Sequence, residues 1–61
     1  MTNETKIALF EKMLDLEHKG ELQSEGKLFD NVDYIAESNG AAKMFEILGI
    51  ESEYIKWSIG K

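Results

Sequence analysis

Apolar residues recur at helical spacing over the first third of the chain, from Asn3 to Lys19. Thr2 or Asn3 is expected to supply the N-cap oxygen of this helix, and Gly20 suits the residue that ends it. The apolar side chains cover about half of the helical cylinder, which is wider than a single core-facing stripe. We therefore expect two neighbours to cover them. The residues in this arc are Ile7, Leu9, Phe10, Met13, Leu14 and Leu16.

The next segment predicts a polar connector followed by a second helix. Residues 20–27 contain two glycines and one serine, which favours a turn or an irregular loop. Asp30 is expected to cap the helix that follows, and Phe29 and Tyr34 have the spacing of a hydrophobic staple. Residues 38–40, Ser-Asn-Gly, are expected to end this helix.

Two more short helices are expected after that glycine. Ala41 to Leu48 is apolar on nearly all sides, which predicts the buried centre of the domain, and Gly49 suits its end. The last helix is expected from Ser52 to Ile59, with Ser52 as its N-cap. Strict alternation of apolar and polar residues is missing, so strands are not expected.

The pattern as a whole predicts an all-α fold of three to four short helices in one small bundle-like domain over residues 1–61. We expect this domain to self-associate. The expected core contains Ile7, Phe10, Met13, Leu14, Phe29, Val32, Ile35, Met44, Phe45, Leu48 and Ile55.

Composition excludes several classes of function. The 61 residues include no cysteine and one histidine, His18, so disulfides, thiolate zinc sites and a thiol nucleophile are excluded. The net charge of −5 argues against binding a phosphate backbone. No apolar run is long enough for a membrane span, and the charged first fifteen residues do not fit a signal peptide. We expect a cytoplasmic protein.

Catalytic or metal-binding chemistry is not expected either. His18 has Asp15 one turn earlier, but a solvated histidine near a helix end is the simpler interpretation. Asp30, Asp33 and Glu37 could share one helix face as oxygen ligands, yet the segment does not have the spacing or the glycine of a calcium loop. We therefore expect no enzyme activity, no cofactor and no metal.

Residues 41–50 resemble the helix-turn-helix motif of DNA-binding proteins. Ala41 and Ala42 match the start of the first helix of that motif, and Leu48, Gly49 and Ile50 match its turn. The resemblance implies a nucleic-acid-binding protein that uses residues 31–61, which is the alternative function. The helix that would enter the groove carries two carboxylates, one lysine and no arginine, which is the wrong charge for this role.

The favoured hypothesis is a non-catalytic protein that binds a protein partner as a regulator or inhibitor. A chain this small rarely buries enough surface alone, so a partner or a second copy, giving a homodimer, is a physical expectation. Small acidic domains also resemble, as a class, phage-encoded inhibitors of host enzymes, which would place the protein in the host cytoplasm. The candidate partner-binding residues are Leu9, Met13, Leu16, Tyr54 and Trp57.

Overall fold

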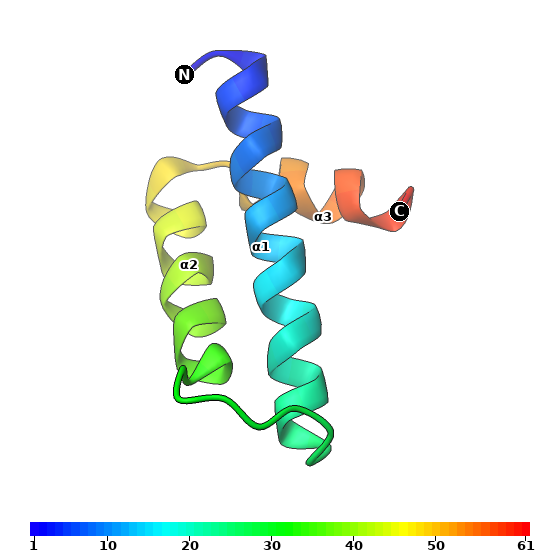
Figure 1. Cartoon of the computed structure of the whole chain (residues 1–61). Helices are drawn as coiled ribbons and strands as arrows, with labels where there is room; N and C mark the ends of the chain where they lie inside the picture. The colour runs from blue at the N-terminus through cyan, green and yellow to red at the C-terminus, as the bar shows by residue number, and fades with distance from the viewer.

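The computed structural model describes all 61 residues and contains three helices and no strands (Figure 1). The helices are α1 (Asn3–Ser24), α2 (Tyr34–Leu48) and α3 (Glu51–Ile59), and 75% of the residues are helical. The predicted all-α fold is confirmed, with three helices. In Figure 1, α1 and α2 lie side by side and antiparallel, while α3 turns across α1 near the end of α2.

The first helix runs past Gly20, so the predicted end at that glycine is wrong. Gly20 is buried, and a Cβ atom built on it would lie 3.4 Å from the Tyr34 carbonyl oxygen and 3.6 Å from the Ile35 Cα. The glycine therefore lets the start of α2 approach the backbone of α1 closely. The chain reverses instead at Gly26, whose φ is 72°.

The second and third predicted helices form one continuous helix, α2. Asp33 is its N-cap, because its carboxylate accepts a hydrogen bond from the Ala36 amide at 3.1 Å. The predicted cap, Asp30, lies in the preceding loop and accepts the Tyr34 hydroxyl at 2.7 Å. The Ser-Asn-Gly sequence at 38–40 does not interrupt the helix, since Gly40 keeps a negative φ and nothing lies within 4 Å of its side-chain position.

At the turn between α2 and α3, the structure confirms the predicted end of α2 but not the predicted start of α3. Gly49 adopts a left-handed conformation with a φ of 74° and ends α2, as predicted. The third helix starts at Glu51, and Ile50 at the cap position makes no side-chain hydrogen bond. The predicted N-cap at Ser52 is therefore wrong. The third helix ends at Ile59, as expected, and Gly60 is its C-cap.

One aromatic ring from each helix meets at the centre of the molecule. The Phe10 ring centroid lies 5.8 Å from that of Phe45 and 5.5 Å from that of Tyr54, and the last two are 5.4 Å apart. Trp57 adds a fourth ring 5.6 Å from Phe10. These tilted and edge-to-face contacts pack all three helices together in one aromatic cluster.

The buried core is smaller than predicted and differs in composition. Phe10, Met13 and Phe45 are buried as expected. Leu14 and Val32 are only half-buried. The buried residues that were not expected in the core are Leu16, Ile50 and Tyr54. The residues wrongly assigned to the core are Ile7, Phe29, Ile35, Met44, Leu48 and Ile55, all exposed.

Two of these errors have a clear physical cause. Phe29 is 89% exposed because the helix starts three residues later than predicted, so the expected staple to Tyr34 cannot form. The 41–48 segment is not the buried centre, because it is the second half of a two-sided helix that packs on α1 along one side only. The wide arc on α1 packs mainly against α2, with a small contact from α3, and Ile7 remains exposed.

Gln23 joins the end of α1 to the start of α2. Its side-chain nitrogen donates to the Val32 carbonyl at 2.8 Å, and its side-chain oxygen accepts the Tyr34 amide at 2.9 Å. Two backbone groups of a loop are thereby satisfied by one half-buried amide side chain. The sequence pattern placed Gln23 in a polar connector and did not reveal this role.

Substitutions of the two glycines within helices, Gly20 and Gly40, should have opposite effects on the free energy of unfolding. Gly20→Leu should lower the free energy of unfolding by about 1–3 kcal/mol, because the added carbons meet the backbone of α2. Gly40→Ala should raise it by up to about 1 kcal/mol, because the site is open and alanine favours a helix. Urea unfolding monitored by circular dichroism measures both. A neutral Gly20→Leu variant would contradict the close approach of α1 and α2.

Removal of the Gln23 amide should also destabilise the fold. Gln23→Leu loses both hydrogen bonds, each worth about 0.5–1.5 kcal/mol. Gln23→Glu keeps an acceptor for the Tyr34 amide but cannot donate to the Val32 carbonyl. We expect the urea concentration at the midpoint of unfolding to be highest for wild type, lower for Gln23→Glu and lowest for Gln23→Leu, as measured by urea titration. Equal midpoints would show that water replaces the amide without cost.

Candidate partner-binding surfaces

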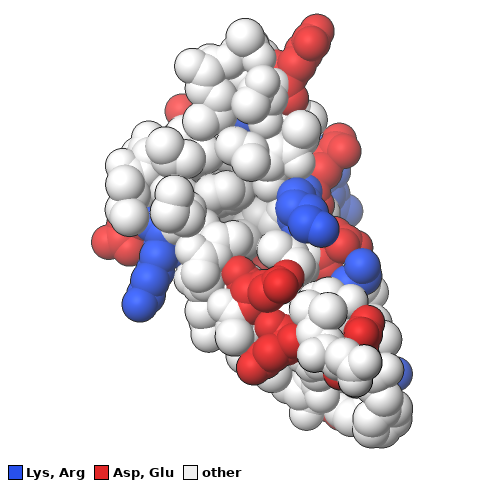
Figure 2. All heavy atoms as spheres, turned by 60° about the vertical axis from the view of Figure 1, so that its left-hand side comes forward, with Lys and Arg blue, Asp and Glu red and all other residues white.

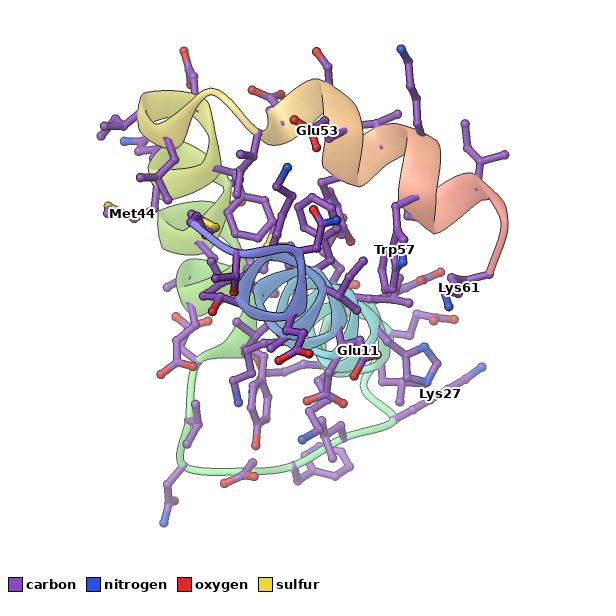
Figure 3. All side chains as sticks on the ribbon, turned by 90° about the horizontal axis from the view of Figure 1, so that it is seen from above. Glu11, Lys27, Met44, Glu53, Trp57 and Lys61 are labelled. Atoms are coloured by element: carbon purple, nitrogen blue, oxygen red, sulfur yellow. The ribbon has the colours of Figure 1, made fainter.

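The five candidate partner-binding residues all belong to the core or pack against it. Met13, Leu16 and Tyr54 are buried. Leu9 and Trp57 are half-buried and pack against the core cluster, and the Lys61 ammonium lies 4.7 Å from the centre of the Trp57 ring (Figure 3). The structure therefore brings them together as packing residues. A partner could reach the three buried side chains only if the core opened.

Several exposed apolar side chains lie together elsewhere, on the outer side of α2. Met44 is 53%, Ile47 77% and Leu48 48% exposed. With about 100° of rotation per residue, Ala36 and Gly40 fall on the same side, away from the buried Phe45. In Figure 3, Met44 points away from α1. We call this surface the α2 face; it consists of Ala36, Gly40, Met44, Ile47 and Leu48.

The α2 face was missed because its pattern appears only in a continuous helix. Positions 36, 40, 44 and 47 follow the spacing of one helix face, but a helix break at residue 40 divides them into two unrelated pairs. The segment 41–48 alone seems apolar on all sides, which indicated burial. The spacing across Gly40 was the available signal.

The accessible surface of the molecule is larger than that of a typical folded monomer of the same mass. Its accessible area is 4492 Å², whereas a folded monomer of 7.0 kDa exposes roughly 4,000 Å². The radius of gyration is 12.0 Å, against roughly 10.5 Å for a typical domain of this length. Figure 2 shows a broad area without charged side chains in the upper part of one side, with acidic side chains below it. The three helices thus leave apolar area uncovered.

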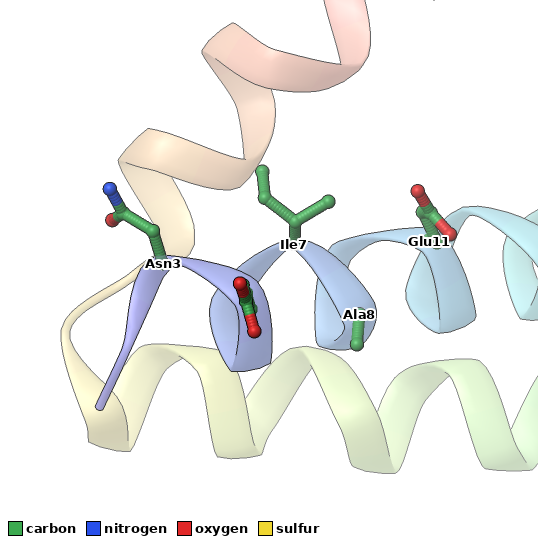
Figure 4. A pocket seen from close by; sticks show the side chains of 5 residues that line it. Asn3, Ile7, Ala8 and Glu11 are labelled. Carbon is green, nitrogen blue, oxygen red and sulfur yellow. The ribbon is translucent and has the colours of Figure 1, made fainter.

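The largest surface hollow lies on α1 alone. It has a volume of about 410 Å³ and is lined by Asn3, Glu4, Ile7, Ala8 and Glu11 (Figure 4). Since all of its lining residues come from one helix, it is a flank of α1 next to α3 and does not enclose a ligand.

Two other hollows lie between helices and meet along one side of α3. Together they form what we call the α3 groove. One, of about 360 Å³, separates α1 from α3; the other, of about 200 Å³, lies where all three helices converge. Glu17, Tyr54 and Ile55 line both hollows. The other lining residues of the α3 groove are Met13, Leu14, His18, Glu21, Ala42, Phe45, Glu51 and Ser58.

Tyr54 connects the floor of the α3 groove to its rim. Its ring is buried in the aromatic cluster, and its hydroxyl donates a hydrogen bond to the Glu17 carboxylate. Burial away from water raises the pKa of the Tyr54 phenol, and the hydrogen bond to Glu17 raises it further. The phenol therefore stays protonated at ordinary pH and holds the Glu17 side chain at the groove.

The remaining ionisable groups do not form a reactive or metal-binding cluster. No three His, Asp or Glu side chains lie close enough to hold a metal ion. Asp30 is engaged by Tyr34, a contact that lowers its pKa, and Asp33 caps α2. No helix has the length and hydropathy of a membrane span.

Comparison of the chain with family models, with curated proteins and with solved structures finds no match. Function is therefore inferred from the surfaces and charges of this chain alone. Two surfaces stand out. The α2 face is apolar and exposed, and the α3 groove has an apolar floor with carboxylates at its rim.

The Tyr54 phenol predicts a loss of stability in alkali. Above about pH 10 the phenol of the unfolded chain loses its proton, whereas the folded chain retains it. The unfolded state then binds fewer protons, so stability falls with rising pH, by at most about 1.4 kcal/mol per pH unit from this group. Tyr54→Phe should flatten that fall, as measured by urea unfolding between pH 8 and 11.

Tyr34→Phe is the matched control for this experiment. Tyr34 also has a raised pKa, through its hydrogen bond to Asp30, but it is more exposed to water. It should contribute less to the alkaline loss than Tyr54. Identical pH profiles for wild type and Tyr54→Phe would contradict the buried, protonated phenol.

Proposed function

We propose that this protein acts by binding another protein, as a small acidic regulator or inhibitor without catalysis or a cofactor. The observation that carries the proposal is the α2 face, where Met44, Ile47 and Leu48 are exposed together on a helix whose opposite side packs in the core. Contiguous exposed apolar surface is typical of interaction sites, whereas single exposed hydrophobic residues are ordinary.

The α2 face can supply only part of the free energy of binding that a stable complex requires. Full burial of a Met, Ile or Leu side chain is worth about 1.5–3 kcal/mol, so the exposed fractions of these three amount to on the order of 4 kcal/mol. A micromolar complex requires about 8 kcal/mol after the cost of association. A partner must therefore make further contacts beyond the α2 face.

The charge on α3 argues against the alternative, a nucleic-acid reader in residues 31–61. The first turn of α3 carries Glu51 and Glu53, and its last turn carries one lysine, Lys56. Lys56 is outnumbered by carboxylates that repel phosphate. Binding of a second copy through the α2 face remains a distinct outcome of the experiment below.

The test compares capture of partners by three forms of the protein. Ile47→Glu places a charge at the most exposed large side chain of the α2 face, and Asn39→Glu adds the same charge to an exposed position outside that face. Tagged proteins are incubated with lysate of the source organism, and bound proteins are identified by mass spectrometry. We expect a stoichiometric protein with wild type and Asn39→Glu, and at least tenfold less with Ile47→Glu.

Circular dichroism and unfolding midpoints must first show that the three forms are equally folded. Capture of the same proteins by all three forms would contradict the proposal. Recovery of the protein itself alone, in an amount that depends on Ile47, would replace it with self-association.

A further inference from the structure

We infer that the α3 groove binds a basic segment of the partner protein, one that presents apolar side chains next to lysine or arginine. This inference rests on the proposed protein-binding function and goes beyond it by naming a second contact and the chemistry of its occupant. The residues of the α3 groove are not those of the α2 face, so the two contacts can be tested separately.

The floor of the α3 groove provides the apolar part of the contact. Ile55 lies where its two hollows meet and is 50% exposed, while Leu14 and Ala42 are half-buried beside it. Side chains of this kind stay partly in water in the free protein, although each could be covered by one apolar residue of a partner. The hollows of about 360 and 200 Å³ leave room for such side chains.

The rim of the α3 groove provides the charge. Glu17, Glu21 and Glu51 line it and are exposed, and no lysine lines either hollow. None of the three carboxylates takes part in an ion pair, since the ion pairs of the chain join Lys6 to Glu53, Lys19 to Asp15 and Lys27 to Glu25. The carboxylates at the rim therefore remain free to pair with cations of a partner.

The overall charge favours the same occupant. The net charge of −5 attracts a basic segment from a distance and repels a second copy of the chain. Glu17 is held towards the α3 groove by the Tyr54 hydroxyl, so one carboxylate of the rim is already positioned. A positioned acceptor loses less conformational entropy on binding than a free side chain does.

The experiment uses three synthetic peptides and the full-length protein. The first peptide alternates lysine and leucine at helical spacing, the second replaces its lysines with glutamate, and the third replaces its leucines with serine. Binding is mapped by changes in the backbone amide resonances of the isotope-labelled protein. We expect the lysine–leucine peptide to shift residues of the α3 groove, and the other two to bind at least tenfold more weakly.

Two charge-reversed double variants distinguish the effect of the carboxylates in the α3 groove from the effect of net charge on peptide binding. Glu21→Lys with Glu51→Lys reverses two carboxylates of the rim, while Glu11→Lys with Glu46→Lys reverses two exposed carboxylates outside the α3 groove. Both doubles have the same net charge. We expect the first double to lose at least tenfold in affinity for the lysine–leucine peptide, and the second to lose no more than about threefold.

Several results would overturn the inference. They are equal losses in the two double variants, equal binding of the lysine–serine or glutamate–leucine peptide, shifts confined to the α2 face, and no binding of any peptide. Each of these leaves the proposed function standing if a partner is still captured in an Ile47-dependent way. Conversely, peptide binding in the α3 groove without any captured partner would contradict the proposed function alone.

Discussion

The structure depends on one contact, the meeting of Phe10, Phe45 and Tyr54, with one ring from each helix. Three helices of 22, 15 and 9 residues have little else to pack, and the buried side chains are few. The short α3 could not be stable alone, since isolated helices of fewer than about 12 residues are marginal in water. It is held because its aromatic face completes the cluster, with the ion pair from Lys6 to Glu53 at 2.7 Å as a minor addition at the surface.

Because all three helices meet only at this aromatic cluster, many apolar side chains remain exposed to water. The extensive helix contact is the one between α1 and α2, and the short α3 adds only a small contact to each of them. The second helix buries Phe45, half-buries Ala41 and Ala42, and leaves its larger aliphatic side chains exposed to water. A fourth helix would cover such a surface in a larger bundle, whereas in this chain the α2 face has no covering element.

The sequence predicted the helical class, an N-cap at Thr2 or Asn3, of which the structure uses Thr2, and the end of α2 at Gly49, because these follow from local chemistry and helical periodicity. It did not predict the course of α1 through Gly20 or of α2 through Gly40. Glycine permits a helix to end but does not require it, and the choice depends on tertiary contacts. At Gly20 the start of α2 lies so close that an added Cβ would be 3.4 Å from the Tyr34 carbonyl oxygen, and no local pattern contains this tertiary contact. The assignment of the core failed at the second helix, because a break placed at Gly40 hid the single exposed side that Met44, Ile47 and Leu48 share in a continuous helix.

The sign of the charge separates the two candidate surfaces by the partner each can accept. The five side chains that define the α2 face are uncharged, although Glu37 lies on the same side of α2, so a second copy or an unrelated protein could cover them. The α3 groove cannot be shared in this way, because its rim contains carboxylates and a second copy would bring a further net charge of −5 to it. An occupant of both surfaces must therefore be apolar on one side and basic on the other, which this chain is not. That requirement favours a different protein over self-association.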